Sequence, residues 1–428
     1  MPKPAGETDR QDLLRRLFNT ALATARPENC VPDFLPPAPK GRLIVVGAGK
    51  AAAAMAKALE DRWQGPISGA VVTRYGYEMR TDRIEVLTAA HPVPDAAGEA
   101  AARRMIDLAR SAGPDDLVLF LLSGGGSALL AAPAPGLTLA DKQAVTRALL
   151  ASGATIGQIN CVRRHLSAIK GGRLAAHAFP APILTLAISD VPGDDPAAIA
   201  SGPSVADATT FADARAILEK YAISPPPAVA RHLQAAKDET PKPGDKRLEL
   251  AEFRMIARPA EMLAAAAGEA ERAGYRVINL GDKLEGEARV IAADHAALAL
   301  RHAETGEKIA ILSGGELTVT VTGAGRGGPN REYALALALS LALAGDEAIT
   351  AIACDTDGAD GAPGSDGADV AGAVIGPHTL ARAAALGLDG EKCLADNDAG
   401  SFFQTLGDSV MTGPTRTNVN DLRVILVG

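Results

Sequence analysis

The chain has 428 residues, more than one ordinary hydrophobic core accommodates, so two or three domains are expected. Hydrophobic residues make up 47% and charged residues 22% of it, the composition of a soluble globular protein. The formal net charge of −8 argues against a nucleic-acid-binding surface, although it leaves room for a local basic cleft that binds an anionic substrate.

Cysteine spacing and the absence of export signals indicate the compartment. The four cysteines lie far apart and show neither zinc nor redox spacing, which favours a reducing environment. The N-terminus carries mixed charges and lacks the apolar segment of a signal peptide. The longest apolar run, over 333–344, is too short to span a membrane. We therefore expect a cytoplasmic protein without a membrane partner.

The first half of the chain alternates helices with strands. Apolar residues at helical spacing predict a helix over 11–26, and a Pro-rich connection leads from it to a strand over 42–46. Strands alternating with helices predict βαβ units and a mostly parallel sheet. The further elements predicted here are a helix over 51–60, strands over 70–73 and 84–87, a helix over 96–111, a strand over 117–122, a helix over 139–151 and a strand over 183–188.

A second series follows a change of composition. The Pro-rich and charged stretch between about 222 and 248 reads as a linker or an exposed flap. We predict an N-terminal domain over 1–240 and a C-terminal domain over 250–428. The second series comprises strands over 253–257, 275–278, 308–312, 318–321, 349–353 and 422–427, and helices over 259–273, 286–303 and 329–344.

Two predicted strands run directly into glycine turns. The strand over 117–122 continues as Ser123-Gly124-Gly125-Gly126-Ser127, and the strand over 308–312 as Ser313-Gly314-Gly315-Glu316. A buried strand, a glycine turn and a helix start gather backbone N–H groups that suit an anion, and the serine hydroxyls add donors. A tight turn that needs positive φ explains either motif equally well in isolation. Because the motif occurs twice, we expect the two turns to face each other across a cleft.

The first strand ends in a pattern that allows a dehydrogenase. Residues 47–52 fit G-x-G-x-x-A, the loose dinucleotide-binding pattern. The next strand ends in Thr73-Arg74, where an NAD site needs a carboxylate and only an NADP site uses an arginine. Lys50 lies at the mouth of this turn, where its ammonium would meet a phosphate or carboxylate, although a solvated lysine fits the position as well. Neither a P-loop nor a G-x-S-x-G nucleophile elbow occurs.

Carboxylates follow two other predicted strands. Asp355 and Asp357 lie in the turn over 355–361, and Asp190 follows the strand over 183–188. Such residues bind magnesium through phosphate oxygens or cap the next helix. From the residues alone we infer two α/β domains that handle small anions, with phosphoryl transfer favoured over hydride transfer.

A set of collinear motifs carries a resemblance that covers essentially the whole chain. The chain resembles the class II glycerate kinase (glycerate 2-kinase) family, and its portion from about 308 to 428 resembles the MOFRL domain of that family. The motifs are LLSGGGSALL, NCVRRHLSAIKGGRLA, ISDVPGDDPAAIASGPS, LSGGELTVTVTGAGRGGPNREYALALA, DTDGADG and the final NDAGSFFQTLGD with TGPTRTNVNDLRVILV.

The resemblance implies a fold and an activity. The fold would comprise an N-terminal Rossmann-like α/β domain and a C-terminal MOFRL-type α/β domain, with the active site in the cleft between them. The activity would be phosphorylation of D-glycerate by ATP with Mg²⁺, most often at the 2-hydroxyl to give 2-phosphoglycerate. Members of the family have also been labelled hydroxypyruvate reductases, so an NAD(P)H-dependent reductase is the alternative. The oligomeric state stays open, with a homodimer as one possibility.

The resemblance also implies site residues. One departure leaves a cation undecided, since relatives often read Gly-Gly-Arg-Asn-Gln-Glu where this chain has GGPNRE at 327–332, and either Arg326 or Arg331 takes that role. The implied catalytic residues are Lys50, Asp190 and Arg331, and the implied metal ligands are Asp190, Asp355 and Asp357. The implied substrate- and nucleotide-binding residues are Ser123, Gly124, Gly125, Gly126, Ser127, Arg164, Lys170, Ser313, Gly314, Gly315, Glu316, Arg326 and Asn330.

Overall fold

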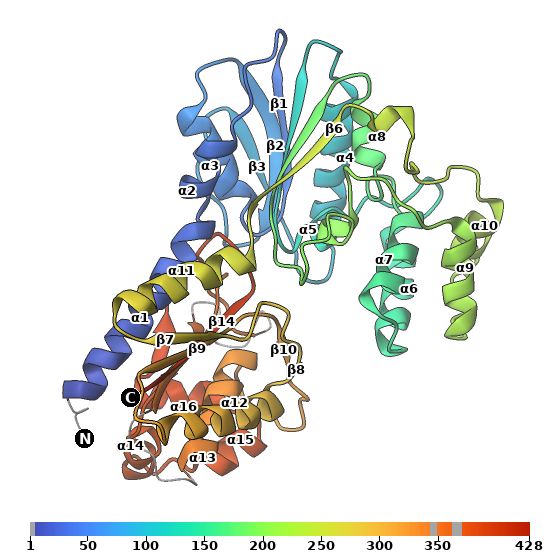
Figure 1. Cartoon of the computed structure of the whole chain (residues 1–428). Coiled ribbons are helices and arrows are strands. Elements are labelled where there is room, and N and C mark those ends of the chain that lie inside the picture. Colours follow the sequence, from blue (N-terminus) through green and yellow to red (C-terminus); the bar gives the residue numbers. More distant parts are fainter. Residues whose placement is uncertain (1–4, 343–348, 362–369) are drawn as a thin grey trace. The chain divides into compact units, whose positions relative to one another are not determined.

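The structure, a computed structural model, describes residues 5–342, 349–361 and 370–428 (Figure 1). It divides into two compact units. Unit 1 consists of residues 1–26 and 257–428, and unit 2 of residues 27–256.

Unit 2 is built on a six-stranded sheet in the order β3-β2-β1-β4-β5-β6, the strand order of doubly wound α/β folds. Strand β1 runs parallel to β2 and β4, β2 to β3, and β4 to β5. Leu122 at the end of β4 lies opposite Ala48 of β1 and Ala187 of β5, so these three strands end at one edge of the sheet. The strands are β1 (Leu43–Ala48), β2 (Ile67–Arg74), β3 (Ile84–Ala89), β4 (Leu117–Leu122), β5 (Ile183–Ile188) and β6 (Ala251–Ala257).

Helices cover both faces of this sheet. Helix α4 (Ala96–Arg110) and helix α8 (Arg173–Ala178) bury their apolar residues against alternate side chains of β1, β4 and β5. Helix α3 (Ala52–Arg62) lies on the other side of the sheet in Figure 1. The shorter helices of this unit are α2 (Pro27–Cys30), η1 (Pro32–Phe34), α5 (Gly126–Leu129), η2 (Ile199–Ser201) and η3 (Lys246–Leu248).

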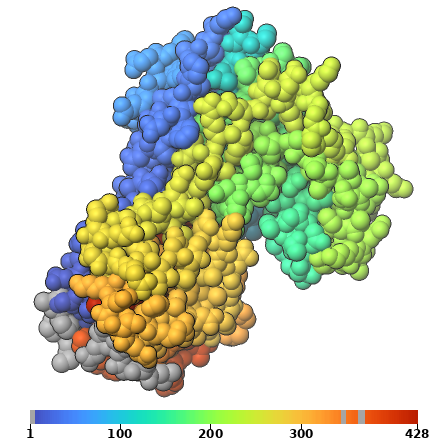
Figure 2. All heavy atoms as spheres, in the orientation of Figure 1, coloured from blue at the N-terminus to red at the C-terminus, as the bar shows by residue number. Residues whose placement is uncertain are grey.

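Four further helices form a lobe of unit 2 with a core of its own, around Leu149, Val162 and Phe211. Capping boxes at Thr138, Thr155 and Thr210 fix where three of these helices begin, because each threonine hydroxyl and the side chain three residues later satisfy backbone N–H groups. Figure 2 shows the lobe coloured green to yellow-green. Its helices are α6 (Leu139–Ala151), α7 (Ile156–His165), α9 (Phe211–Lys220) and α10 (Pro227–Ala235).

Unit 1 contains a second six-stranded sheet, in the order β13-β12-β11-β14-β9-β7. Helices α12, α13 and α16 pack on one face around a core that includes Ile311, Tyr333 and Phe402, while α1 and α11 contact strands of the same sheet. Its strands are β7 (Arg276–Asn279), β9 (Ile309–Ser313), β11 (Ile349–Asp355), β12 (Val370–Ile375), β13 (Ser409–Met411) and β14 (Asp421–Val427), with β8 (Gly286–Glu287) and β10 (Leu317–Thr318) paired separately. Its helices are α1 (Ala5–Ala25), α11 (Pro259–Arg272), α12 (Ala288–Ala303), α13 (Pro329–Ala342), α14 (Thr379–Ala385), α15 (Gly390–Ala395) and α16 (Ala399–Leu406).

Strand direction in unit 1 differs from the predicted mostly parallel arrangement. Strand β14 lies between β11 and β9 and runs antiparallel to both, and β12 runs antiparallel to β11 and β13. Only β7 and β9 are parallel among the described strand pairs of this sheet. The parallel arrangement holds in unit 2, whereas alternating strands and helices do not reveal that in unit 1 the last strand of the chain inserts between two earlier ones.

One predicted element of unit 1 is shorter than expected, and another extends beyond the described residues. The alternating run over 318–321 contributes only the two-residue strand β10. The predicted helix over 329–344 is α13, which is described as far as Ala342, and positions 343 and 344 lie outside the described residues. No helix in the described part of the chain is long and apolar enough to cross a bilayer.

The two compact units have other bounds than the predicted domains over 1–240 and 250–428, which stay predictions. Strand β6, predicted to open the second series, joins the sheet of unit 2. Helix α1 belongs to unit 1, where it packs on α11 and β11. Its apolar stripe, which includes Leu14, Leu17 and Phe18, is buried. An amphipathic stripe predicts that a helix is covered but does not say by which sheet, so sequence order alone misplaced α1.

The placement of α1 can be tested with Phe18→Ala. Phe18 is 2% exposed, so this change should lower the free energy of unfolding of unit 1 by about 3 kcal/mol or more. Trp63, the single tryptophan, is buried in unit 2, so its fluorescence reports on that unit in a urea titration. We expect an earlier loss of helical circular dichroism while the Trp63 transition stays in place. The exposed Arg16→Ala on the same helix is the control, and an equal shift of both signals would contradict the assignment.

Candidate active site

The turns after β1 and β4 lock together at the edge of the unit 2 sheet. The Ser123 hydroxyl accepts a hydrogen bond from the Ala51 N–H at 2.9 Å, and the Lys50 N–H donates to the Gly124 carbonyl at 2.8 Å. Gly49 has φ of +136°, and a Cβ there would lie 2.1 Å from the Ser123 hydroxyl oxygen. The first turn can therefore approach the second only because Gly49 has no side chain.

Two side chains converge on the middle of the 123–127 turn. A Cβ built on Gly125, whose φ is +79°, would lie 3.1 Å from Nε2 of His91 and 3.4 Å from Cγ of Lys50. The N–H groups of Gly124, Gly125 and Ser127 donate to no backbone carbonyl within the described residues. The predicted helix after this turn is α5, a single turn of four residues, so the donors for an anion are the turn's own amides and the Lys50 ammonium.

The Lys170 side chain contacts this turn at Ser127. Its side chain is 2% exposed, and its Nζ contacts the Ser127 carbonyl at 2.8 Å, the Ser127 hydroxyl at 3.1 Å and the Ala200 carbonyl at 3.3 Å. Burial, and then the neighbouring Lys142 and Arg163, lower the pKa of Lys170 well below its usual value. The predicted binding residues Ser127 and Lys170 are therefore in direct contact.

The other two predicted residues of unit 2 have different surroundings. Asp190 follows β5 and is half-buried, so it lies at the same edge of the sheet as the 123–127 turn. Arg164, predicted to bind substrate, instead forms a buried ion pair with Asp207 at 2.6 Å. Thr209 and Thr240 also donate to Asp207, so the Arg164 guanidinium belongs to the core of the helical lobe.

The second Ser-Gly-Gly turn, in unit 1, is organised by a buried arginine. Arg423 of β14 is 1% exposed, and it donates from Nε to the Ser313 hydroxyl at 3.2 Å and from Nη2 to the carbonyls of Gly314 and Gly315, the latter at 2.9 Å. Gly315 has φ of +89°, and a Cβ there would lie 2.2 Å from the Leu284 carbonyl oxygen. Glu316 is exposed. This turn thus presents its carbonyls to a cation inside the protein.

A network of buried polar groups extends from Arg423. Arg423 donates to Asp421 at 3.0 Å, and the Asn330 amide donates to the other oxygen of Asp421 at 2.9 Å. Arg331, which is 2% exposed, donates from Nε to Asp360 at 2.8 Å. Burial raises the pKa of both Asp360 and Asp421, and the arginines oppose that rise.

The sequence left open whether Arg326 or Arg331 is the cation of the site, and the surroundings of the two arginines differ. Arg331 is buried, and its Nε and Nη2 donate to Asp360; its role as a catalytic cation stays a prediction. Arg326 is exposed, and its side chain contacts the Ser401 hydroxyl at 3.2 Å. Of the two, Arg326 is the one whose guanidinium solvent can reach.

The predicted metal ligands of unit 1, Asp355 and Asp357, accept hydrogen bonds from backbone N–H groups of the turn in which they lie. The Asp355 carboxylate accepts the Asp357 N–H at 2.8 Å, and the Asp357 carboxylate accepts the Ala359 N–H at 2.7 Å. Asp357 is 1% exposed, whereas Asp355 is half-buried. Carboxylate oxygens are the donors that Mg²⁺ prefers, so these two residues fit that ion chemically. No group of three or more His, Cys, Asp or Glu suited to a metal occurs in residues 5–342, 349–361 and 370–428.

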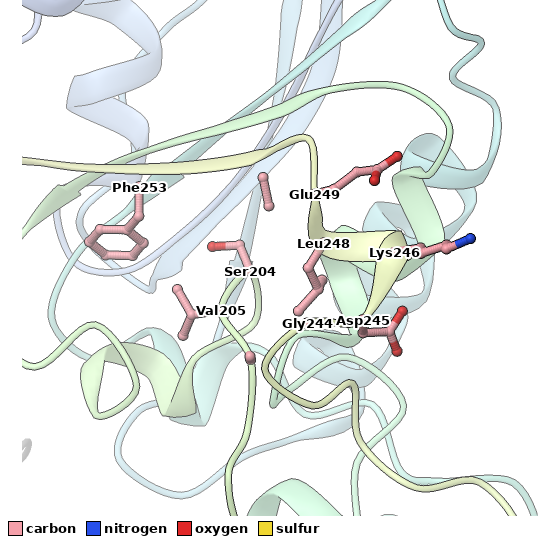
Figure 3. A pocket seen from close by; sticks show the side chains of 10 residues that line it. Ser204, Val205, Gly244, Asp245, Lys246, Leu248, Glu249 and Phe253 are labelled. Carbon is pink, nitrogen blue, oxygen red and sulfur yellow. The ribbon is translucent and has the colours of Figure 1, made fainter.

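A pocket of about 370 Å³ lies elsewhere in unit 2 (Figure 3). Val205, Leu248 and Phe253 line it. The Ile183 N–H at the start of β5 donates to the carbonyl of Leu250, which lies next to this pocket in the sequence. The pocket therefore lies toward the N-terminal end of β5, whereas Asp190 follows its C-terminal end. It contains none of the predicted site residues.

Sequence reasoning missed several members of these clusters. His91 was not predicted as a site residue, while Ser201 and Asn160 lay inside quoted motifs without being singled out. Arg423 had a readable signal, because a charged residue inside the otherwise apolar run 422–427 must find a partner when the strand is buried.

Comparisons with known proteins cover nearly the whole chain. Residues 13–234 match the family described as "Domain of unknown function (DUF4147)", and residues 309–421 match the MOFRL family. A protein of Agrobacterium vitis, provisionally named a hydroxypyruvate reductase, is 49% identical over 98% of this chain and 94% of its own. The D-glycerate 2-kinase of Thermotoga maritima is 39% identical over 96% of this chain and 97% of its own. A crystal structure of glycerate kinase from Thermotoga maritima matches with a TM-score of 0.88 and 36% identity, covering 98% of this chain and 100% of that one.

The role of Arg423 can be tested with Arg423→Met. The change leaves Asp421 buried without its cation, and we expect the free energy of unfolding to fall by about 3–5 kcal/mol at pH 8. Burial already raises the pKa of Asp421, and loss of Arg423 raises it further. A carboxyl whose folded-state pKa exceeds its unfolded value contributes stability below the unfolded pKa and loses it as pH rises through the folded pKa. The fall in the free energy of unfolding caused by Arg423→Met should therefore be smaller at pH 5 than at pH 8 in urea titrations.

The control for this prediction is Arg276→Met. Arg276 lies in the same sheet and pairs with Glu307 at 2.9 Å, but both side chains are 56% exposed. Its removal should cost less than about 1 kcal/mol. Similar losses for the two variants, or a loss in Arg423→Met that does not change with pH, would count against a buried Asp421 charge.

Proposed function

Because the chain belongs to the glycerate 2-kinase family and matches both the DUF4147 and the MOFRL family, we propose that it transfers the terminal phosphoryl group of ATP to D-glycerate. The observation that carries this proposal is the arrangement at the 123–127 turn, where Lys50 and backbone amides of the turn lie together. Phosphoryl transfer needs positioning and charge neutralisation more than covalent chemistry, and this arrangement offers both.

A specific contact weighs against the reductase alternative. In a dinucleotide site the N–H groups that open the helix after G-x-G-x-x-A bind the pyrophosphate. Here the Ala51 N–H is taken by the Ser123 hydroxyl and the Lys50 N–H by the Gly124 carbonyl. The space above Gly49 is filled by Ser123. The turn over 47–52 therefore holds a neighbouring loop, and its geometry favours a kinase over a nicotinamide enzyme.

We assign roles to residues by their surroundings. Lys50 neutralises charge on the transferred group, and Asp190 orients the attacking hydroxyl of glycerate or accepts its proton. Arg326 replaces Arg331 as the arginine available to a ligand, because Arg331 is buried against Asp360. Asp190, Asp355 and Asp357 would hold Mg²⁺, which supplies charge neutralisation at phosphate oxygens when bound.

The finer parts of the proposal rest on the family resemblance and on composition. They are transfer to the 2-hydroxyl, a cytoplasmic location, and small-molecule substrates without a nucleic-acid or membrane partner, in keeping with the net charge of −8. A homodimer is the proposed assembly. The predicted domain division, and the prediction that the site lies in a cleft between the two domains, stay predictions.

Two assays distinguish the candidate reactions. Purified protein is given D-glycerate with Mg-ATP in one, and hydroxypyruvate with NADH or NADPH in the other. We expect ADP release that requires glycerate and no nicotinamide oxidation, because the nucleotide cradle of a reductase is filled by Ser123. Nuclear magnetic resonance of the product then identifies the phosphorylated hydroxyl. Nicotinamide oxidation without glycerate-dependent ADP release would overturn the proposal.

The charge of Lys50 can be tested with Lys50→Ala. The side chain is only half-buried, so the melting temperature should change little. The value of kcat/KM should fall about ten- to a thousand-fold, the scale of one preorganised electrostatic contact. Lys57→Ala, on the exposed side of the adjoining helix with Asp61 as its partner, is the matched control. Activity equal to that of Lys57→Ala would make Lys50 an ordinary surface lysine.

A further inference from the structure

Three cations of unit 2 lie near one another, and none of them forms an ion pair within the described residues. Lys142 of α6 and Arg163 of α7 are the charged neighbours of Lys170. Lys170 is 2% and Lys142 8% exposed, and Arg163 is half-buried. The acidic group that acts on Lys142 is Glu99 of α4, whose carboxylate already pairs with Arg103. A buried charge is costly unless an opposite charge lies beside it, so a bound anion would stabilise this group.

Two of these cations have N–H groups to spare. Lys142 donates one hydrogen bond, from Nζ to the Ala132 carbonyl at 3.2 Å. The Arg163 guanidinium donates to no residue that the structure describes. Because an ammonium has three donors and a guanidinium five, both side chains keep donors for a ligand. The three donors of Lys170, in contrast, are taken by the Ser127 carbonyl, the Ser127 hydroxyl and the Ala200 carbonyl.

A chain of hydrogen bonds leads from Lys170 to a further donor, Asn160. Lys170 donates to the Ser127 hydroxyl at 3.1 Å, and the Ser127 hydroxyl donates to the Ser201 hydroxyl at 3.0 Å. The direction of the second bond follows from the third, in which Ser201 gives its single proton to Oδ1 of Asn160 at 3.1 Å. Nδ2 of Asn160 donates to no described residue, although Asn160 is 4% exposed. An unused donor on a buried side chain is costly, so it also favours a ligand that accepts hydrogen bonds.

The backbone beside this chain of hydrogen bonds is held in an unusual conformation. Ala200 and Ser201 have φ of +49° and +64°, although neither is glycine. Residues other than glycine keep such conformations where the surrounding structure requires them, most often at functional sites. Here they direct the Ala200 carbonyl to Lys170 at 3.3 Å and place the Ser201 hydroxyl between Ser127 and Asn160.

The available donors lie close together and limit what can bind. Asn160 and Arg163 are three residues apart on α7 and therefore share a face of that helix. Lys142 and Lys170 are the other two members, and with Asn160 they are all buried, so the site has room only for a small group. Ser127 and Arg163 are half-buried and leave it open to solvent. Donors and positive charges alone suit a carboxylate or a single phosphate, which only accept hydrogen bonds when fully ionised.

We propose that Lys142, Asn160 and Arg163 bind a small oxyanion, with the charge of Lys170 behind them. The oxyanion is the carboxylate of the acceptor acid, an assignment that rests on the function proposed above. The carboxylate offsets the repulsion among the three cations. It leaves Lys50 and the amides of the 123–127 turn for the phosphoryl group, so the two anionic groups of the reaction have separate places in unit 2.

Calorimetry tests the site at equilibrium, without turnover. Full-length protein is titrated with D-glycerate in a buffer free of phosphate, sulfate and carboxylates, both alone and with a non-hydrolysable ATP analogue. We expect binding of D-glycerate but not of glycerol, which keeps hydroxyls but lacks the carboxylate. Inorganic phosphate is titrated separately, and tighter binding of phosphate would support an oxyanion site but overturn its assignment to the carboxylate. Binding of neither anion in either condition, or equal binding of glycerol, would overturn the proposal.

Two variants locate the site. Arg163→Met and Lys142→Met should each weaken D-glycerate binding about 10- to 100-fold, the scale of a lost charge-assisted hydrogen bond. Their melting temperatures should not fall, because each change removes a cation that repels the other two. Arg147→Met, on the exposed side of α6, is the matched control and should bind like wild type. Wild-type affinity in both Arg163→Met and Lys142→Met would overturn the proposal.

Steady-state kinetics separate this inference from the proposed function. Removal of a contact made equally to bound substrate and to the transition state raises KM and leaves kcat unchanged. In an active kinase, Arg163→Met should therefore raise the KM for glycerate. An active kinase with an unchanged KM would overturn the oxyanion site and leave the proposed function intact. Wild-type protein that binds D-glycerate through Arg163 but releases no ADP would do the reverse.

The pH dependence of binding tests Lys142. Burial, and then Arg163, lower the pKa of Lys142 to about 7, whereas Glu99 opposes this shift. An oxyanion favours the ammonium form, and glycerate itself stays ionised, so its affinity should fall as pH rises from 7 to 9. Lys142→Arg supplies a charge that does not titrate in this range, so its affinity should fall less, with Lys170 responsible for the remainder. An equal fall in Lys142→Arg would exclude Lys142 from the site.

Discussion

The hydrogen bond from the Ala51 N–H to the Ser123 hydroxyl is the contact on which the site of unit 2 depends. It joins the turns after two neighbouring parallel strands, and it requires the missing side chain of Gly49. With the turns fixed, the Lys50 side chain lies close to Gly125 of the second turn. The same contact uses an N–H that a dinucleotide would need. The Ser123 hydroxyl thus holds together the two turns that form the anion site. It also argues against the dehydrogenase that the glycine pattern over 47–52 allowed.

Buried cations organise both glycine turns, with opposite chemical consequences. In unit 1, Arg423 lies beside Asp421 and donates to the Ser313 hydroxyl and to glycine carbonyls, so its charge is balanced and its turn is held rigidly. In unit 2, Lys170 has only neutral oxygens as partners and cations as neighbours, so its charge is not balanced within the fold. A guanidinium stays charged under such conditions, whereas an amine can release its proton. The Arg423 guanidinium therefore keeps its charge, whereas burial lowers the pKa of Lys170.

Much of the fold was predictable, because buried strands and capped helices leave local signals. The strand over 117–122 and the helix over 139–151 were predicted at their observed bounds. The direction of β14, the sheet that receives β6 and the unit that holds α1 were not predictable, since each depends on contacts between residues far apart in the chain. For the site, the glycine turns and strand-end residues were readable from the sequence. The engagement of Arg164 by Asp207 and of Arg331 by Asp360 was not, because a motif names an arginine without its partner.

The Ser-Gly-Gly motif occurs in both units and shows what a local sequence motif determines and what it does not. In both units it follows a buried strand and contains a glycine with positive φ, +79° at Gly125 and +89° at Gly315. Yet Ser123 accepts from a backbone N–H of the adjoining turn, whereas Ser313 accepts from a buried guanidinium. The motif specifies a backbone conformation, and what that conformation does depends on the residue brought against it from another strand. In unit 2 that partner is the Lys50 turn, which adds a cation at the surface, and in unit 1 it is Arg423, which places the cation inside. Only the first arrangement brings a half-buried lysine close to turn amides that donate to no backbone carbonyl among the described residues, a combination that suits a phosphate.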